Sequence, residues 1–149
     1  MNFKPIGIVK SPVKEGVDSG WSDVVSGIYV DHKYAGGLIG LSSFSHIIVI
    51  FEMHRSTWTP KNDLIRRPQG REDMPLVGIF AQRAKHRPNP IGITSVRLLG
   101  IKGNIIRIQG LDAIDETPVI DIKPYYPHYD KVEKPITPEW VNRLMSDYF

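Results

Sequence analysis

The stretch "ITSVRLLGIKGNIIRIQG", Ile93–Gly110, decides the fold class of this chain. Apolar and polar side chains alternate in its two halves, and the segment Leu99–Asn104 between them contains glycine and asparagine, which favour turns. A period of two is typical of a β-strand with one buried face. We therefore predict an antiparallel hairpin with strands at 93–99 and 104–110. Hairpins of this kind favour a barrel or a sandwich over a βαβ sheet.

Further segments with the same alternation predict a mainly β protein. They are Ile6–Val9, Gly27–Val30, His46–Met53, Leu76–Ala81 and Thr117–Ile122.

Two helices complete the predicted secondary structure. One is short and lies around Tyr34–Leu41, and the other follows Thr137. Thr137 can cap the second helix, because its hydroxyl accepts from a free backbone N–H, and Pro138 suits the first helical position. The buried stripe of this helix would then consist of Trp140, Leu144 and Met145.

The composition is that of one globular domain. Of the 149 residues 41% are hydrophobic and 23% charged, and no apolar run approaches the roughly 20 residues that span a bilayer. Residues 1–10 alternate like a strand rather than a leader peptide, so we expect a single cytoplasmic domain over 1–149. The absence of cysteine excludes disulfides, thiolate zinc sites and thiol catalysis. The formal charge of +3 favours anionic partners only weakly.

The stretch "RAKHRPNPIGIT", Arg83–Thr94, concentrates cations beside two prolines. Each proline fixes its own φ and pushes the preceding residue to extended geometry, so the RPNP segment is stiff without a ladder of hydrogen bonds. In an extended chain Arg83, Lys85 and Arg87 would form a row of cations on one side. Asn89 adds an amide that can pair with an adenine edge or a carboxylate. A solvated surface loop is the alternative interpretation.

The stretch "HIIVIFEMH", His46–His54, raises the question of a metal site. Its parity places His46, Glu52 and His54 on one face of a strand. Eight residues of strand would separate the two imidazoles by about 26 Å, so they cannot share one ion. We expect no metal.

The stretch "DETPVIDIKPYYP", Asp115–Pro127, places a carboxylate and an ammonium, those of Asp121 and Lys123, on one strand face. They can pair with each other, or the carboxylate can accept from a ligand. Tyr125, Tyr126 and Tyr129 offer flat surfaces for a base, although aromatic residues beside proline also pack turns.

The segment 55–75 shows no periodicity and holds Arg66, Arg67 and Arg71. We interpret it as a long loop, and loops of this length in compact domains are usually functional or disordered. The glycine-rich and P-loop signatures of nucleotide enzymes, GxGxxG and GxxxxGK[ST], are absent, as are HExxH and GxSxG. A Rossmann enzyme or a P-loop NTPase is therefore not expected.

Taken together, these stretches resemble the TsaA-like family of S-adenosylmethionine-dependent tRNA methyltransferases, known in bacteria as TrmO. The matching elements are "LSSFSHIIVIFEMH", "GIFAQRAKHRPNPIGIT" and "LDAIDETPVIDIKPYYP", and "PIGIVKSPVKEG" resembles the family's start. The resemblance implies a small single-sheeted β-barrel with short peripheral helices and a C-terminal helix. It also implies a homodimer that methylates N6 of threonylcarbamoyl-adenosine at position 37 of tRNA, here without the extra C-terminal domain of many bacterial members.

The resemblance further implies which residues bind the methyl donor. S-adenosylmethionine would lie against residues from four segments: Ser11, Pro12, His54, Arg55, Arg87, Asn89, Ile120, Asp121, Ile122 and Lys123.

The chemistry of the implied reaction suggests further roles. N6 must lose a proton, and Asp121 or His46 would accept it. Arg83 or Lys85 would recognise the threonyl carboxylate of the substrate. Phosphates of the tRNA would be contacted by the loop arginines Arg66, Arg67 and Arg71.

Four residues depart from the family pattern. Gln82 stands where threonine is usual, Lys85-His86 where an apolar or small pair is usual, and Glu116 where glycine is usual. Glu116 indicates a changed turn, and Lys85-His86 bears on substrate specificity. Two other functions stay open: a non-catalytic RNA-binding β-barrel, and a methyltransferase that acts on another adenine-containing substrate. Binding of the methyl donor distinguishes an enzyme from a pure RNA-binding module.

Overall fold

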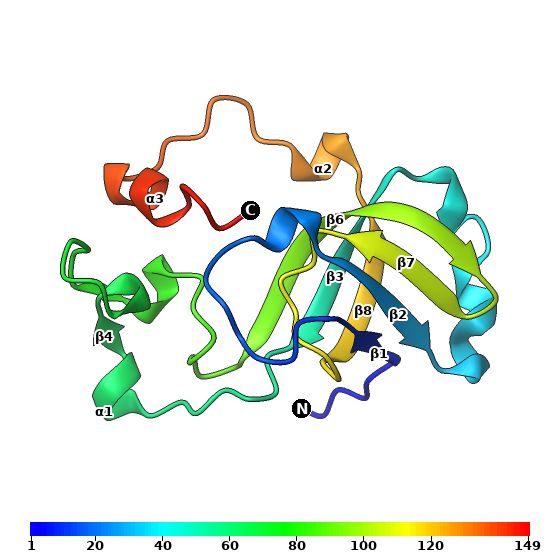
Figure 1. Ribbon diagram of the computed structural model, residues 1–149, viewed down its shortest axis with the longest axis horizontal. Coiled ribbons are helices and arrows are strands. Elements are labelled where there is room, and N and C mark those ends of the chain that lie inside the picture. Colours follow the sequence, from blue (N-terminus) through cyan, green and yellow to red (C-terminus); the bar gives the residue numbers. More distant parts are fainter.

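The computed structural model describes all residues, 1–149, and its centre is a closed antiparallel β-barrel (Figure 1). Around the barrel the strands follow the order β1-β2-β7-β6-β3-β8. Their bounds are β1 Gly7–Lys10, β2 Val25–Val30, β3 His46–Glu52, β6 Ile91–Lys102, β7 Ile105–Gln109 and β8 Pro118–Pro124. The predicted mainly β class and the single-sheeted barrel are confirmed.

The hairpin of β6 and β7 confirms the pairing predicted from the opening stretch, but its turn is shorter than predicted. β6 continues to Lys102, and Gly103 turns the chain with a φ of 60°. Much of the predicted turn is therefore strand. A register shift between Leu98 and Gly100 allows this, because a bulge bends a strand without ending it.

Alternate side chains of the strands fill the barrel. In β3, Ile47, Val49 and Phe51 are buried, whereas His46 and Glu52 at its ends are exposed. β-branched and aromatic residues suit this pleated surface. The core cluster consists of Val9, Ile28, Val30, Ile47, Val49, Phe51, Val96, Ile106, Ile108, Leu111, Ala113 and Val119.

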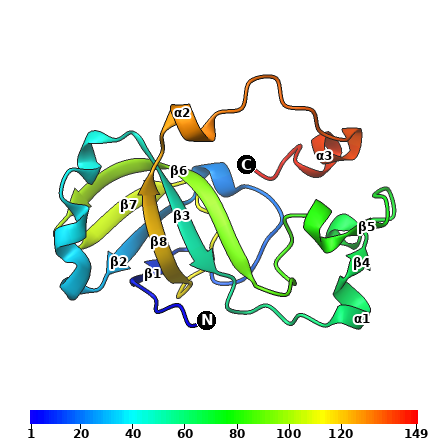
Figure 2. The ribbon, with the colours of Figure 1, turned by 180° about the vertical axis from the view of Figure 1, so that it is seen from behind.

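Between β3 and β6 the chain forms an arm, residues 55–81, that stands to one side of the barrel (Figures 1 and 2). It contains α1 Pro60–Asp63 and a two-stranded sheet of β4 Ile65–Arg66 and β5 Val77–Gly78. The long loop predicted for 55–75 is thus wrong in part, because Asp63 accepts from the Thr59 backbone N–H at 2.8 Å and stabilises α1. The strand predicted for 76–81 is also mostly wrong: Ile79–Ala81 is a 3-10 turn.

The other helices are short. The helix predicted around 34–41 consists of two 3-10 segments, His32–Leu38 and Leu41–Ser43, and α2 Pro127–Asp130 was not predicted. The 3-10 helix Trp21–Asp23 precedes β2, and another covers Pro68–Gly70 in the arm. None of the helices is long and apolar enough to cross a membrane.

The C-terminal helix α3, Glu139–Leu144, lies beside the arm (Figures 1 and 2). Its N-cap is Pro138 rather than Thr137, so the predicted capping is wrong by one residue. Trp140 and Leu144 are partly buried, but Met145 is exposed, and the predicted buried stripe is wrong there. The helix packs through few contacts, one of which is a hydrogen bond of 2.9 Å from Arg143 Nη2 to the Asp73 carbonyl.

Glu116 adopts a backbone conformation that glycine also favours, so the predicted change of the turn stays a prediction. Its φ of 64° lies in the left-handed region that favours glycine. Its carboxylate pairs with Lys10, a contact that glycine could not make.

Candidate functional site

A cavity of about 1110 Å³ lies beside the barrel, and several parts of the chain form its walls. Strands β3 and β6 supply Phe51, Ile93 and Thr94. The RPNP loop, residues 82–89, forms a second wall, and the C-terminal residues Leu144, Met145, Tyr148 and Phe149 form a third. Such a cavity is large enough for a nucleoside-sized ligand.

The charged residues of this cavity are mostly cations. Only two acids line it, Asp18 and Asp112. The cations are Arg55, Arg66, Arg83, Lys85 and Arg87. The cavity therefore favours a ligand with anionic groups.

The RPNP loop is bent rather than extended, so the predicted row of cations is wrong. Residues 85–89 form consecutive bends. Arg87 Nη1 donates to the carbonyls of Gln82 at 2.9 Å and Ala84 at 3.3 Å, and Arg83 donates to the carbonyl of Ile93. Prolines restrict single dihedral angles, whereas these bonds from side chain to backbone determine the path of the loop.

Gln82 joins the RPNP loop to the arm. It is buried, and its Nε2 donates to the carbonyls of Arg66 and Val77, both at 3.0 Å. The sequence marks Gln82 as a departure from the family pattern, but its partners lie on a different element and are not visible there.

Unpartnered polar atoms gather at the cavity. Buried side-chain polar atoms normally have a hydrogen-bond partner, and those without one call for a water or a ligand. Five such atoms occur in the chain, and all but Ser26 Oγ belong to residues that line the cavity. They are His54 Nδ1, Ser56 Oγ, Arg66 Nε and Gln82 Oε1.

His86 is held in its neutral form. The backbone N–H of Thr57 donates to its Nδ1 at 2.9 Å, so this nitrogen is an acceptor. Burial, and next the positive charge of Lys85, lower the pKa of His86. At neutral pH the imidazole therefore adds no charge to the cavity.

The residues expected to bind the donor fall into two groups. His54, Arg55, Arg87 and Asn89 line the cavity, but Ser11, Pro12 and the strand residues Ile120, Asp121, Ile122 and Lys123 do not. Ser11 is buried in a turn, where its N–H donates to Asp115 at 2.9 Å.

Asp121 lies on the outer face of the barrel. It forms an ion pair of 2.7 Å with Lys123, which is the simpler of the two alternatives considered above. Asp121 is opposite Ile50, and Ile50 is opposite the cavity residue Ile93. Two strand spacings, about 10 Å, thus separate Asp121 from the cavity wall.

His46 is also outside the cavity. Its Nδ1 shares a hydrogen bond of 2.8 Å with Ser45 Oγ, and its ring meets Tyr125 edge-on. His46 begins β3 and His54 follows its other end, and no group of three or more metal-ligating side chains occurs in the chain.

Tyr126 and Tyr129 form an aromatic cluster with Phe44. The Phe44 and Tyr126 rings stack at 5.8 Å, and Tyr126 and Tyr129 lie 6.1 Å apart. Tyr129 is 85% exposed. This cluster does not line the cavity, so any base that stacks on it would bind at a separate place.

The loop arginines have partners within the arm. Arg66 lies 3.5 Å from Asp63, Arg67 donates to the Met74 carbonyl, and Arg71 forms a bidentate pair with Asp73. Their predicted contacts with tRNA phosphates stay a prediction.

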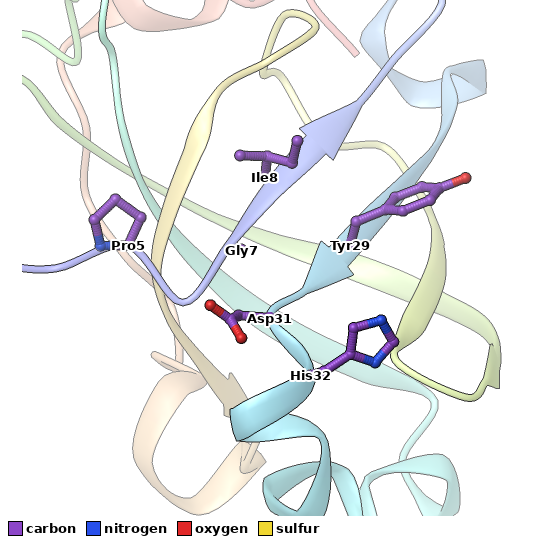
Figure 3. A pocket seen from close by; sticks show the side chains of 6 residues that line it. All are labelled: Pro5, Gly7, Ile8, Tyr29, Asp31 and His32. Atoms are coloured by element: carbon purple, nitrogen blue, oxygen red, sulfur yellow. The ribbon is translucent and has the colours of Figure 1, made fainter.

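A smaller hollow of about 330 Å³ lies at β1 and β2 (Figure 3). Its lining residues are Pro5, Gly7, Ile8, Tyr29, Asp31 and His32. The carboxylate of Asp31 already accepts from the Lys33 backbone N–H at 3.1 Å and pairs with its ammonium, so this hollow offers little to a ligand.

Sequence reasoning missed Asp112 and Tyr148. Thr94 Oγ1 and Tyr148 Oη both donate to the Asp112 carboxylate, the latter at 2.7 Å. Burial, and next the charge of Asp112, raise the pKa of the Tyr148 hydroxyl, which therefore remains protonated. No local pattern could have indicated this contact, because its residues belong to three segments far apart in the sequence.

Fold and site together define a small antiparallel β-barrel with a cationic cavity beside it. The chain belongs to the family described as the tRNA-methyltransferase O N-terminal domain, whose model matches residues 12–131. This confirms the family resemblance of the sequence.

Named relatives agree with this membership. A probable S-adenosyl-L-methionine-binding protein of Pyrococcus abyssi is 43% identical over 133 residues, which cover 86% of this chain and 70% of that protein. The S-adenosyl-L-methionine-binding protein of Archaeoglobus fulgidus is 39% identical over 138 residues, 90% of this chain and 96% of that protein. The human tRNA (adenine(37)-N6)-methyltransferase is 37% identical over 101 residues, 68% of this chain and 22% of the human protein.

A crystal structure of TrmO from Pseudomonas aeruginosa superimposes with a TM-score of 0.76 at 28% identity. The match covers 94% of this chain but 61% of the crystallised one.

Proposed function

We propose that this protein binds S-adenosylmethionine in the cavity and methylates N6 of threonylcarbamoyl-adenosine at position 37 of tRNA. Family membership and the names of the relatives support the reaction type. The observation that carries the proposal is the concentration of unpartnered buried polar atoms in a cavity lined by the RPNP loop.

The residues of the cavity fit the methyl donor. Its carboxylate suits one of the cations, a ring nitrogen can accept from His54 Nδ1, and a hydroxyl can donate to Gln82 Oε1. Its adenine ring suits the apolar wall at Phe51.

When bound, S-adenosylmethionine supplies a methyl group whose carbon bonds to N6 as the carbon–sulfur bond breaks and its electron pair stays on sulfur. The protein has to orient the two reactants and accept the N6 proton. Orientation alone can contribute roughly 7–11 kcal/mol in the best cases. The RPNP loop suits this task because Arg87 holds it closed from within.

The substrate carries a threonyl carboxylate, which plain adenosine lacks. We assign its recognition to Arg83 or Lys85, both of which line the cavity. Methylation of tRNA with unmodified adenosine-37 at an equal rate would refute this assignment.

A homodimer would bring together the two groups of residues expected to bind the donor, those that line the cavity and those that lie outside it. The outer face of the barrel carries the cavity residues Ile91 and Ile93, which are 40% and 50% exposed, and Ile93 lies two strands away from Asp121; Phe80 of the arm is 80% exposed. A second copy seated on this face would cover these apolar side chains and bring its own β8 towards the cavity. Asp121 or His46 would then reach N6 from the partner and accept its proton.

Two experiments test the dimer and the proton acceptor. Light scattering of the wild-type protein should give twice the chain mass, and Ile93→Glu should give the chain mass. Mixing Arg87→Ala with Asp121→Asn protein should restore activity if the site is shared, because one of the two mixed sites is then intact.

Calorimetric titration with S-adenosylmethionine tests the donor site first. Binding to the wild type but not to Arg87→Ala, with equal melting temperatures, would support the proposal. Lys131→Ala is the control, since Lys131 does not line the cavity.

The competing function is an RNA-binding module without catalysis. The cluster of Phe44, Tyr126 and Tyr129 favours it, because its two tyrosines are exposed and bases stack on such rings. Binding of tRNA without binding of the donor would establish this alternative. A remaining alternative is a methyltransferase that acts on another adenine-containing substrate. Donor-dependent methylation of such a compound would establish that function.

A further inference from the structure

Asp112 is an acid in a cavity of cations. Its carboxylate is partly buried and has two fixed partners, Thr94 on β6 and Tyr148 near the C-terminus. The proposed reaction uses neither the carboxylate nor these contacts.

The segment that carries Tyr148 is fixed at its far side as well. The backbone N–H groups of Gly20 and Trp21 donate to the carbonyls of Asp147 and Tyr148 at 3.1 and 3.0 Å. Tyr148 is therefore held from both sides, and its hydroxyl restrains the carboxylate of Asp112 to one orientation.

The composition of the cavity limits what this carboxylate can do. Five cations surround the space, and the other acid, Asp18, is exposed. A positively charged ligand group would be repelled over most of the lining and would find its favourable place beside Asp112.

The two hydrogen bonds narrow the choice of that group. Each oxygen of Asp112 already accepts one hydrogen bond, so the carboxylate has negative charge to offer but fewer free lone-pair directions. An ammonium needs several hydrogen-bond acceptors, whereas a sulfonium has no N–H or O–H groups and pairs by charge alone.

We propose that Asp112 recognises the sulfonium of the methyl donor, and that Thr94 and Tyr148 position its carboxylate for this purpose. The inference rests on the proposed donor site and adds a determinant of specificity to it. Transfer of the methyl group leaves a neutral thioether, which loses the attraction to Asp112. The protein would thus prefer donor over spent product, and product would exchange for fresh donor.

The test compares the affinities of S-adenosylmethionine and S-adenosylhomocysteine by calorimetry in matched variants. Both ligands contain the same ammonium, carboxylate and nucleoside, so their affinity ratio reports on the sulfonium charge. Asp112→Asn should weaken S-adenosylmethionine about tenfold and leave S-adenosylhomocysteine nearly unchanged. Asp18→Asn, which removes the other acid of the cavity, should leave the ratio unaltered.

A second variant covers the case that Asp112→Asn fails to fold. Tyr148→Phe keeps the charge of Asp112 but removes one of the hydrogen bonds that position its carboxylate, so the preference for S-adenosylmethionine over S-adenosylhomocysteine should fall. An unchanged or increased preference would overturn the inference.

The remaining outcomes have separate meanings. Equal weakening of both ligands by Asp112→Asn would show that the carboxylate binds a group common to both, and no effect on either would show that it binds neither. Each result overturns the inference while the donor site stands. If the wild type bound neither ligand, the proposed function would fail first and the inference with it.

Discussion

Gly92 lies directly opposite Phe51 in the pairing of β6 with β3, and the Phe51 ring covers the place where a side chain would stand. A Cβ atom at position 92 would lie 2.4 Å from Cε2 and Cζ of Phe51 and 2.9 Å from Cε1. Carbon atoms at rest are about 3.5–4.0 Å apart, so the ring or the strand must move by about 1 Å. Both residues line the cavity, and the movement would change its wall.

We predict that Gly92→Ala destabilises the protein by about 1–2 kcal/mol. Overpacking of a core costs about 1–3 kcal/mol, and the lower entropy of the unfolded alanine chain offsets up to about 1 kcal/mol of this. For a domain of this size the melting temperature should fall by roughly 2–8 °C. Urea denaturation and thermal melts measure both quantities.

Two further variants decide whether the ring is the cause. Gly100→Ala is the matched control on the same strand, because a Cβ there meets nothing within 4 Å, and we expect a change below about 0.5 kcal/mol. Phe51→Leu removes the ring, so the double variant should be more stable than the sum of the single effects by about 1 kcal/mol or more. Additive effects in this double-mutant cycle would refute the reasoning.

Three other predictions concern the site. Arg87→Lys should weaken donor binding about tenfold or more, because one ammonium cannot reproduce the planar guanidinium that holds two carbonyls; wild-type affinity in calorimetry would contradict this. The pKa of His86 is lowered in the folded state, so the unfolded chain binds more protons as the pH falls below about 6.5, and stability should decrease there. His86→Gln should reduce that loss in urea titrations at pH 7.5 and 5.5, and parallel losses in both proteins would exclude His86 as the cause. Replacement of Arg66, Arg67 and Arg71 by alanine should lower the slope of log affinity for tRNA against log salt by about 2–3 if each contacts a phosphate, and an unaltered slope would disprove these contacts.

Strand prediction succeeded where one face of a strand meets the core. The segments at β1, β2, β3, β7 and β8 were placed within a few residues, because burial of one face imposes a period of two on the sequence. It failed in the arm, where β4 and β5 have two residues each and are too short to show a period. The C-terminal helix was recognised from its threonine and proline, although its cap is one residue later than predicted.

The sequence by itself determined the class of fold, the family and the segment that forms one wall of the cavity. These properties depend on residues that are neighbours in the chain, namely alternating apolar residues, a β-hairpin and prolines beside cations. Only the tertiary structure decided that Arg87 turns inward to the backbone of its own loop, and that Asp121 faces away from the cavity. It also decided that Tyr148 meets Asp112. Contacts between segments far apart in the chain arise when the barrel closes and the arm and C-terminus pack beside it, and no local pattern encodes them.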